Sequence, residues 1–276
     1  MNVTYVMFRA HKKLKLCFIV ILVIVAGLLI GLKIKLNPLL AFDPSTVPPI
    51  TANPMQQDKI FAVSLFRSGQ GHDYSYGSWD GETCRSMKHY FNMGQNQVNN
   101  RPARSVPTGS ETVIKIYAPL DGTITDNHAE QTPIGTQVRI ASAKDNHFYI
   151  RLFHIDLLPS LKVGSNVQAG QLVGTIGPKD GMDVSYEANY RFGQTVYLSI
   201  FDYMTDEAFS PYQALGFKKS DFVLSRSQAD ANNYKCNGEQ FVKTTNTTGN
   251  NNGDLEGYVS LRPNPYAPIL HDQYKK

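Results

Sequence analysis

Among the seven histidines and 23 Asp and Glu residues of this 276-residue sequence, the candidates to hold and use a metal ion are His72, Asp73, His89 and His154. Imidazole and carboxylate groups are ligands that Zn²⁺ prefers, in a tetrahedral set that leaves one position for water in catalytic sites. A zinc-bound water loses its proton near neutral pH and becomes a nucleophile for a peptide bond. A hydrolytic zinc site therefore requires the fold to bring His154 close to at least two of the other three.

Short segments with glycine turns surround His154. Apolar residues alternate in APLDGTI (118–124), in FYIRLFHID (148–156) and in LKVGSNVQAGQLVGTIG (161–177). Alternation with a period of two indicates half-buried strands, and glycine supplies the positive φ that tight turns between them need. These three segments predict a mainly β fold.

The same segments resemble the core of the lysostaphin-type, or LytM-like, zinc endopeptidases, over roughly a third to a half of the chain. The resemblance implies an antiparallel β-sandwich of the barrel-sandwich hybrid type (the duplicated hybrid motif), followed here by short helices. It also implies a zinc ion held by a His-x-x-x-Asp pair and by the last histidine of a His-x-His pair. His154 resembles, in place and context, a histidine that assists catalysis in that family. The sequence pattern VGxxVxAGQxxG also occurs in biotinyl, lipoyl and membrane-fusion adaptor domains, so it indicates a strand–turn–strand arrangement more than an activity.

The sequence departs from that family at both zinc motifs. Tyr197 and Ser199, in TVYLSIFDYM, stand where the resemblance places the His-x-His pair, and neither hydroxyl is a good substitute for neutral imidazole at zinc. Tyr76 stands four residues after His72, and His89 also lacks an aspartate at that offset. We therefore predict a degenerate site, with either no cofactor or a zinc ion in a rearranged ligand set, and a binding groove lined by Tyr76, Tyr197 and Ser199.

A purely structural interpretation of these histidines remains open beside the catalytic one. Proteins of this size commonly bury a few histidines that only satisfy local hydrogen bonds. Asp73 is also of a type that closes an Asx-turn. The sequence contains no Walker phosphate loop, His-Glu-x-x-His, Cys-x-x-Cys or Gly-x-Ser-x-Gly motif, which leaves few other common enzyme classes.

An uninterrupted apolar run of 17 residues, 16–32, is long enough to cross a bilayer as a helix. Four Lys and Arg residues precede the run and only Lys33 and Lys35 closely follow it, which places the amino terminus in the cytoplasm. We predict a signal anchor over 14–35, a single pass through the cell membrane and an extracytoplasmic C-terminal domain, with cleavage as a signal peptide as the alternative. A Gly27-x-x-x-Gly31 face would let two such helices pack as a homodimer.

The predicted anchor also accounts for the formal net charge of +4. Residues 1–35 hold 6 of the 27 Lys and Arg and none of the 23 Asp and Glu, which leaves 21 minus 23, or −2, for the rest of the chain. A slightly acidic outer part gives no support to nucleic-acid binding.

Cysteine usage agrees with an extracytoplasmic location. Cys17 lies in the apolar run, so Cys84 and Cys236 form the only pair outside it. A single disulfide between these two is the economical prediction for an oxidising compartment, and two unrelated buried thiols are the alternative.

The chain divides by composition into five segments. We predict a cytoplasmic N-terminus (1–13), the anchor (14–35), a proline-rich linker (36–58), a LytM-like β domain (59–204) and a C-terminal extension of short helices and a polar loop (205–276). Two functions follow from this organisation. The favoured one is a membrane-anchored domain without catalysis that binds a peptide, a cell-wall polymer or an envelope protein. The alternative is an atypical zinc metalloendopeptidase that acts on peptidoglycan or another envelope peptide.

Overall fold

The computed structural model describes residues 21–23, 25, 43–92, 114–130, 135–176, 181–190, 193–242 and 257–261. The chain forms two compact units, Met1–Thr46 and Val47–Lys276. The described part of the first unit includes the 3₁₀ turn η1 (Pro44–Thr46), where the carboxylate of Asp43 accepts hydrogen bonds from the amide and hydroxyl of Ser45. Most of the predicted anchor lies outside the described residues, and among those residues no helix has the length and apolar character to cross a membrane.

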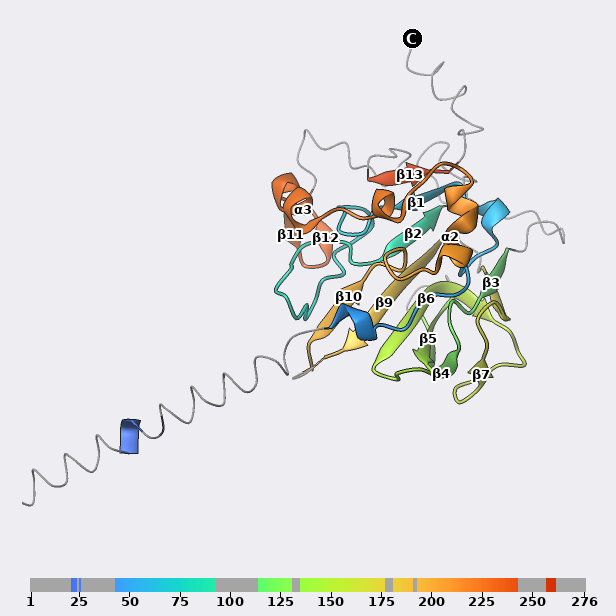
Figure 1. Ribbon diagram of the computed structural model, residues 1–276, viewed down its shortest axis with the longest axis horizontal. Coiled ribbons are helices and arrows are strands. Elements are labelled where there is room, and N and C mark those ends of the chain that lie inside the picture. Colours follow the sequence, from blue (N-terminus) through green and yellow to red (C-terminus); the bar gives the residue numbers. More distant parts are fainter. Residues whose placement is uncertain are drawn as a thin grey trace, which may run out of the picture. The chain divides into compact units, whose positions relative to one another are not determined.

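In the part of the second unit that the structure describes, eleven strands form one antiparallel sheet (Figure 1). The strands are β1 (Ala62–Ser64), β2 (His89–Asn92), β3 (Lys115–Tyr117), β4 (Gly122–Ala129), β5 (Thr136–Ser142), β6 (Phe148–Leu157), β7 (Asn166–Val167), β8 (Leu172–Ile176), β9 (Met182–Asn189), β10 (Thr195–Leu198) and β13 (Tyr258–Ser260). Their main order is β13-β1-β2-β9-β6-β5-β4-β7, with β10 paired to β9, and β8 paired to both β3 and β6. The prediction of a mainly β, antiparallel fold is therefore confirmed.

The remaining elements of the described residues are short, and all but η2 lie in the C-terminal extension, for which the sequence predicts short helices. They are the 3₁₀ turns η2 (Gln57–Lys59) and η5 (Lys219–Phe222), the helices α2 (Asp206–Gln213) and α3 (Arg226–Asn232), and a two-stranded hairpin of β11 (Cys236–Asn237) and β12 (Gln240–Phe241). Helix α2 begins after Thr205, whose hydroxyl accepts a hydrogen bond from the amide of Ala208 and so satisfies one free donor of the first turn.

The two central strands, β6 and β9, sort their side chains onto two faces. In β9, Val184 and Tyr186 pair with Leu152 and Ile150 of β6, and all four are buried in the apolar core. The intervening residues of β9, which are Asp183, Ser185 and Glu187, lie on the opposite face because successive strand residues alternate. We call that side of the sheet the polar face.

Aromatic residues from the end of the β domain and from the C-terminal extension close the apolar side. Phe201 stacks on Phe222 with ring centroids 4.0 Å apart and meets His89 of β2 edge to face at 4.9 Å. Ile50 and Met55, which fall in the range predicted as linker, are also buried. Ile50 exchanges backbone hydrogen bonds with the residues before α2, so this stretch of chain packs as part of the second unit.

The polar face is covered by residues 68–86, which we call the covering loop. Its backbone bonds to the edge of β10, where the amide of Thr195 donates to the carbonyl of Gly77 and the carbonyl of Thr195 accepts from Trp79. The amide of Asp73 donates to the carbonyl of Glu239 in the β11–β12 turn. The covering loop is thus bonded both to the sheet and to the C-terminal hairpin.

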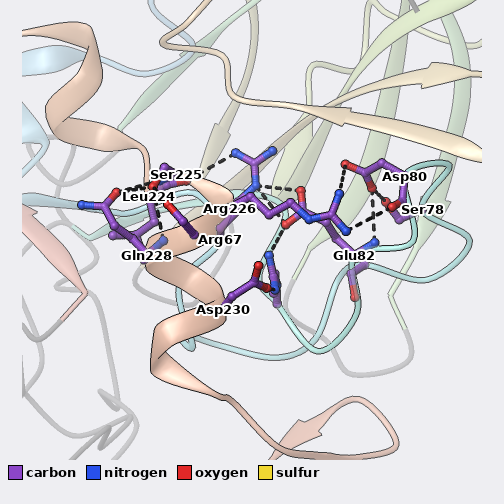
Figure 2. A network of polar contacts seen from close by, with 12 residues as sticks. Arg67, Ser78, Asp80, Glu82, Leu224, Ser225, Arg226, Gln228 and Asp230 are labelled. Carbon is purple, nitrogen blue, oxygen red and sulfur yellow. Dashed lines mark hydrogen bonds and ion pairs between the residues drawn. The ribbon is translucent and has the colours of Figure 1, made fainter. Parts of the chain in front are cut away.

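A disulfide and a buried carboxylate fix the base of the covering loop. Cys84 and Cys236 are bonded, which confirms the predicted pair. Glu82, whose side chain is fully buried, accepts two hydrogen bonds from Arg67 at 2.8 and 3.0 Å and a third from Arg85 (Figure 2). Arg85 also pairs with Asp230 of α3. Two cations thereby neutralise Glu82 where water does not reach it.

Removing the disulfide should lower stability substantially. The bond closes a loop of 152 residues, and the chain-entropy model gives up to about 5 kcal/mol for such a loop. The variant Cys84→Ser/Cys236→Ser should therefore unfold on the order of 10 °C below the wild type in a thermal melt. Cys17→Ser is the matched control and should melt like the wild type; equal melting of all three proteins would contradict the prediction.

Candidate functional site

One end of the polar face holds a cluster of charged side chains from five different segments. We call it the charged cluster, and its members are His72 of the covering loop, Lys88 immediately before β2, Glu130 immediately after β4, His154 of β6 and Asp183 of β9. Every member touches at least one other, in the order His72, Lys88, Asp183, His154, Glu130.

Lys88 stands at the centre of the charged cluster with its side chain 1% exposed. Its ammonium donates to Asp183 Oδ2 at 2.8 Å. It also lies over the rings of Phe153, Tyr74 and Tyr90, with the nitrogen 4.2, 4.9 and 4.9 Å from the ring centroids. An ion pair together with cation–π contacts offsets the cost of removing an ammonium group from water.

His72 is a neutral acceptor in this arrangement. Its Nε2 lies 3.1 Å from Lys88 Nζ, and because an ammonium carries only donors, Nε2 accepts. The other ring nitrogen, Nδ1, then carries the hydrogen and donates to the carbonyl of Asp73 at 3.0 Å. Burial, followed by the charge of Lys88, lowers the pKa of His72, which is consistent with a neutral ring.

His154 is held between two carboxylates. Nδ1 lies 2.6 Å from Glu130 Oε2, and Nε2 lies 3.3 Å from Asp183 Oδ2. Burial disfavours the charged ring, but the hydrogen bonds and charges of Asp183 and Glu130 outweigh burial and raise the pKa of His154. Its side chain is 24% exposed, so the charged cluster reaches solvent at this imidazole, as it also does at the partly buried His72.

A bulge in β6 explains how His154 reaches the polar face. Its neighbour Phe153 already points there, so strict alternation would turn His154 to the other side. The register between β5 and β6 shifts at this point, and His154 adopts a left-handed φ of 63°. Gly135 allows the approach, because a Cβ there would lie 2.7 Å from the backbone carbon of His154. Bulges that redirect a side chain in this way are typical of functional sites.

A second buried carboxylate ties the covering loop to the sheet. Glu187 accepts hydrogen bonds from the hydroxyls of Tyr74 at 2.8 Å, Tyr149 at 2.7 Å and Ser185. Arg151 Nε lies 3.5 Å from Glu187 Oε1 and supplies a compensating charge. Burial and the charge of Glu187 raise the pKa of both tyrosines, so their hydroxyls remain protonated donors.

The structure separates the three residues predicted as metal ligands. His72 belongs to the charged cluster, whereas Asp73 accepts hydrogen bonds from Ser75 and from the amide of Arg85 within the covering loop. His89 is fully buried on the apolar side, where Nδ1 donates to the carbonyl of Ser64 and Nε2 accepts from Ser199. Among the described residues, no three His, Cys, Asp or Glu side chains are arranged to hold a metal ion.

The three predicted groove residues are also divided between the two sides of the sheet. Tyr197 lies on the polar side, where its hydroxyl donates to the carbonyl of Tyr76 at 2.8 Å. The side chain of Tyr76 is 94% exposed. Ser199 is 1% exposed and bonds to His89, so it lies in the core and does not join the other two.

Sequence reasoning missed Lys88, Asp183 and Glu130. A signal for Asp183 was present: in MDVSYEAN the polar residues Asp183, Ser185 and Glu187 recur at every second position between apolar ones. That pattern is typical of a strand with one polar face. Lys88 and Glu130 offer no comparable pattern, because each lies just outside a strand.

Comparison with known proteins yields distant structural matches only. No protein-family model matches the sequence, and no curated protein matches it either. Helicobacter pylori Csd3 matches at 14% identity and a TM-score of 0.36 over 57% of this chain and 33% of that one, so the chain spans about a third of its length. A chain of the SpoIIQ–SpoIIIAH pore-forming complex matches at 12% identity and a TM-score of 0.37, over 60% and 98% of the two chains. Lysostaphin in solution matches at 18% identity and a TM-score of 0.29, over 48% and 51%. Sequence identities and TM-scores this low assign no function.

The pH dependence of stability should report on His89. Burial lowers the pKa of His89 to about 4, against 6.5 for an unperturbed histidine. The unfolded chain therefore binds the extra proton first, so the contribution is fully present above pH 6.5 and is lost as the pH falls towards 4. The loss amounts to about 3 kcal/mol. In urea denaturation, His89→Gln should be less stable than the wild type at pH 7.5 and should lose less stability between pH 6.5 and 4.

The control for this measurement is His128→Gln, since the His128 side chain is 48% exposed. Its stability should fall with pH as steeply as that of the wild type. An equally steep fall in His89→Gln would show that His89 is not the buried neutral histidine described here.

Proposed function

We propose that this chain is a membrane-anchored, extracytoplasmic domain of the LytM-like peptidase fold that binds a peptide, a cell-wall polymer or an envelope protein without cleaving it. One observation carries the proposal: the side chain of Lys88 fills the space between His72 Nε2 and Asp183 Oδ2. Those are the two groups of the charged cluster best suited to bind a metal cation, and a resident ammonium repels a divalent ion by charge and by volume.

The charged cluster also lacks a free imidazole to activate water. The lone pair of His72 Nε2 faces Lys88, and the two nitrogens of His154 face Glu130 and Asp183. A general base needs an unoccupied acceptor within reach of the water that it deprotonates. In this arrangement every imidazole nitrogen of the charged cluster already faces a partner.

The covering loop offers a fixed, exposed aromatic residue for binding. The backbone of Tyr76 is held by Tyr197 while its ring is 94% exposed. Nearby in the loop, Trp79 packs on Tyr190 with ring centroids 5.1 Å apart. An exposed ring on a loop that is already ordered loses little conformational entropy on binding, which suits it as an anchor.

The proposed location follows from two properties of the chain. The disulfide between Cys84 and Cys236 is of the kind that persists in oxidising compartments. The apolar run at 16–32, with its basic residues on the amino-terminal side, supports a membrane anchor with the rest of the chain outside the cytoplasm.

One observation favours the second candidate, an atypical zinc hydrolase. If Lys88 were withdrawn, His72 Nε2 and Asp183 Oδ2 would face a common point, with His154 Nε2 3.3 Å from the latter. Zinc bound there would supply a Lewis acid and an activated water. His154 would then be placed to exchange a proton with the reacting groups.

Zinc content distinguishes the two candidates. The purified full chain is exposed briefly to zinc, desalted and subjected to elemental analysis, alongside His154→Ala and Lys88→Ala. The proposal predicts background zinc in the wild type, no hydrolysis of peptidoglycan peptides, and zinc uptake only in Lys88→Ala, where the blocking side chain is gone. About one zinc per wild-type chain, with hydrolysis that His154→Ala abolishes, would establish the hydrolase instead.

Binding itself is tested with purified cell walls and with envelope peptides. In a cosedimentation assay, Tyr76→Ala should bind at least about tenfold more weakly than the wild type, which corresponds to about 1.4 kcal/mol. Leu215→Ala is the control, because Leu215 is half exposed and follows α2 in the sequence, outside the covering loop. Equal binding by both variants would remove Tyr76 from the binding surface.

A further inference from the structure

The pair of Lys88 and Asp183 differs from the other lysine ion pairs among the described residues. Its side chains are 1% and 6% exposed. By comparison, the pairs of Lys59 with Asp58 and of Lys219 with Asp206 have at least one side chain more than half exposed. A lysine amine, unlike a guanidinium group, becomes a good nucleophile once it loses a proton in a site shielded from water.

Proton acceptors and donors stand at both ends of this pair. His72 Nε2 lies 3.1 Å from the nitrogen of Lys88 with its lone pair directed at it. His154 Nε2 lies 3.3 Å from Asp183 Oδ2, the same oxygen that Lys88 contacts. A base at the amine and an acid at the carboxyl are the two groups that condensation of an amine with a carboxylic acid requires.

The surroundings favour a neutral product. The rings of Phe153, Tyr74 and Tyr90 enclose the amine. Two buried charges carry a desolvation cost of several kcal/mol each, and an amide carries none of it. The reacting groups are also held in contact by the fold, which gives an intramolecular reaction a high effective concentration.

We propose that Lys88 and Asp183 condense to form an intramolecular isopeptide bond between Nζ and Cγ. His72 accepts one proton from the ammonium, and the amine nitrogen then attacks Cγ of Asp183. His154 gives its proton to Oδ2, which receives a second proton from the attacking nitrogen and leaves as water when the C–O bond breaks. The proton on His72 returns to His154 through solvent. The ion pair minus one water is the amide, so no further reactant is needed.

The bond would join the start of β2 to β9 across 95 residues of sequence. It would also fix the Lys88 side chain permanently in the place where it separates His72 from Asp183. The inference is nevertheless independent of the proposed function, because an ion pair alone suffices to fill that place.

Intact mass spectrometry of the full chain, reduced and denatured, tests the bond directly. The wild type should weigh one water less than its sequence, with the N-terminus established in the same digest. Trypsin should release peptide 86–104 joined to peptide 180–191, without cleavage after Lys88. Lys88→Arg keeps the positive charge but lacks the amine, so it should have its full sequence mass, be cleaved after residue 88 and release peptides 89–104 and 180–191 separately.

Two further variants test the roles of the neighbours. His154→Ala should form the cross-link much more slowly than the wild type in a time course after refolding, because the proton donor is missing. Asp183→Asn should lose ammonia in place of water. A wild type at full sequence mass would overturn the inference, as would a water loss confined to peptide 180–191, which an aspartimide at Asp180–Gly181 would produce. Neither result would alter the zinc measurement, so the two proposals fail separately.

Discussion

The burial of one amine, that of Lys88, constrains the whole polar side of this protein. An ammonium group that is 1% exposed is tolerated only if a carboxylate, an acceptor and a polarisable shell surround it. Asp183 supplies the carboxylate, His72 supplies the acceptor, and three aromatic rings supply the shell. Because His72 belongs to the covering loop and Asp183 to the central strand, the same contacts that solvate the amine hold the loop over the sheet.

The sheet makes this possible through the alternation of its central strands. In β9 one set of side chains builds the apolar core while the set between them carries Asp183, Ser185 and Glu187. The bulge at His154 adds one more group to the polar side, out of the normal alternation. Glu82 and the disulfide fix the base of the covering loop. The polar face is therefore an interior with its own ion pairs, and the outward-facing part of the loop, including Tyr76, is exposed.

The sequence was sufficient to predict the mainly β fold, the short C-terminal helices and the Cys84–Cys236 pair. Period-two alternation and glycine turns depend only on residues that are near in sequence. The disulfide could be predicted because only two cysteines lie outside the apolar run. The site was harder to predict because a shift of one position along a strand moves a side chain to the opposite face of the sheet. Lys88 and His89 are neighbours in sequence. Histidine is the metal-ligand type of the two, yet His89 faces the core and Lys88 faces the polar side. Tyr197 and Ser199 would share a face within a strand, but β10 ends at Leu198 and Ser199 turns into the core. The contact between His154 and Glu130 depends on a bulge in β6, and the alternation of apolar and polar residues in the sequence does not reveal where a bulge occurs.

The central claim is that Lys88, and not a metal ion, occupies the space between His72 and Asp183. A crystal structure of the wild-type protein grown in excess zinc, with diffraction recorded on both sides of the zinc absorption edge, tests it most directly. We expect density for the Lys88 side chain between these two residues and no anomalous peak there. An anomalous zinc peak bound by His72 and Asp183, with Lys88 displaced, would contradict the account and make the domain a metalloenzyme candidate.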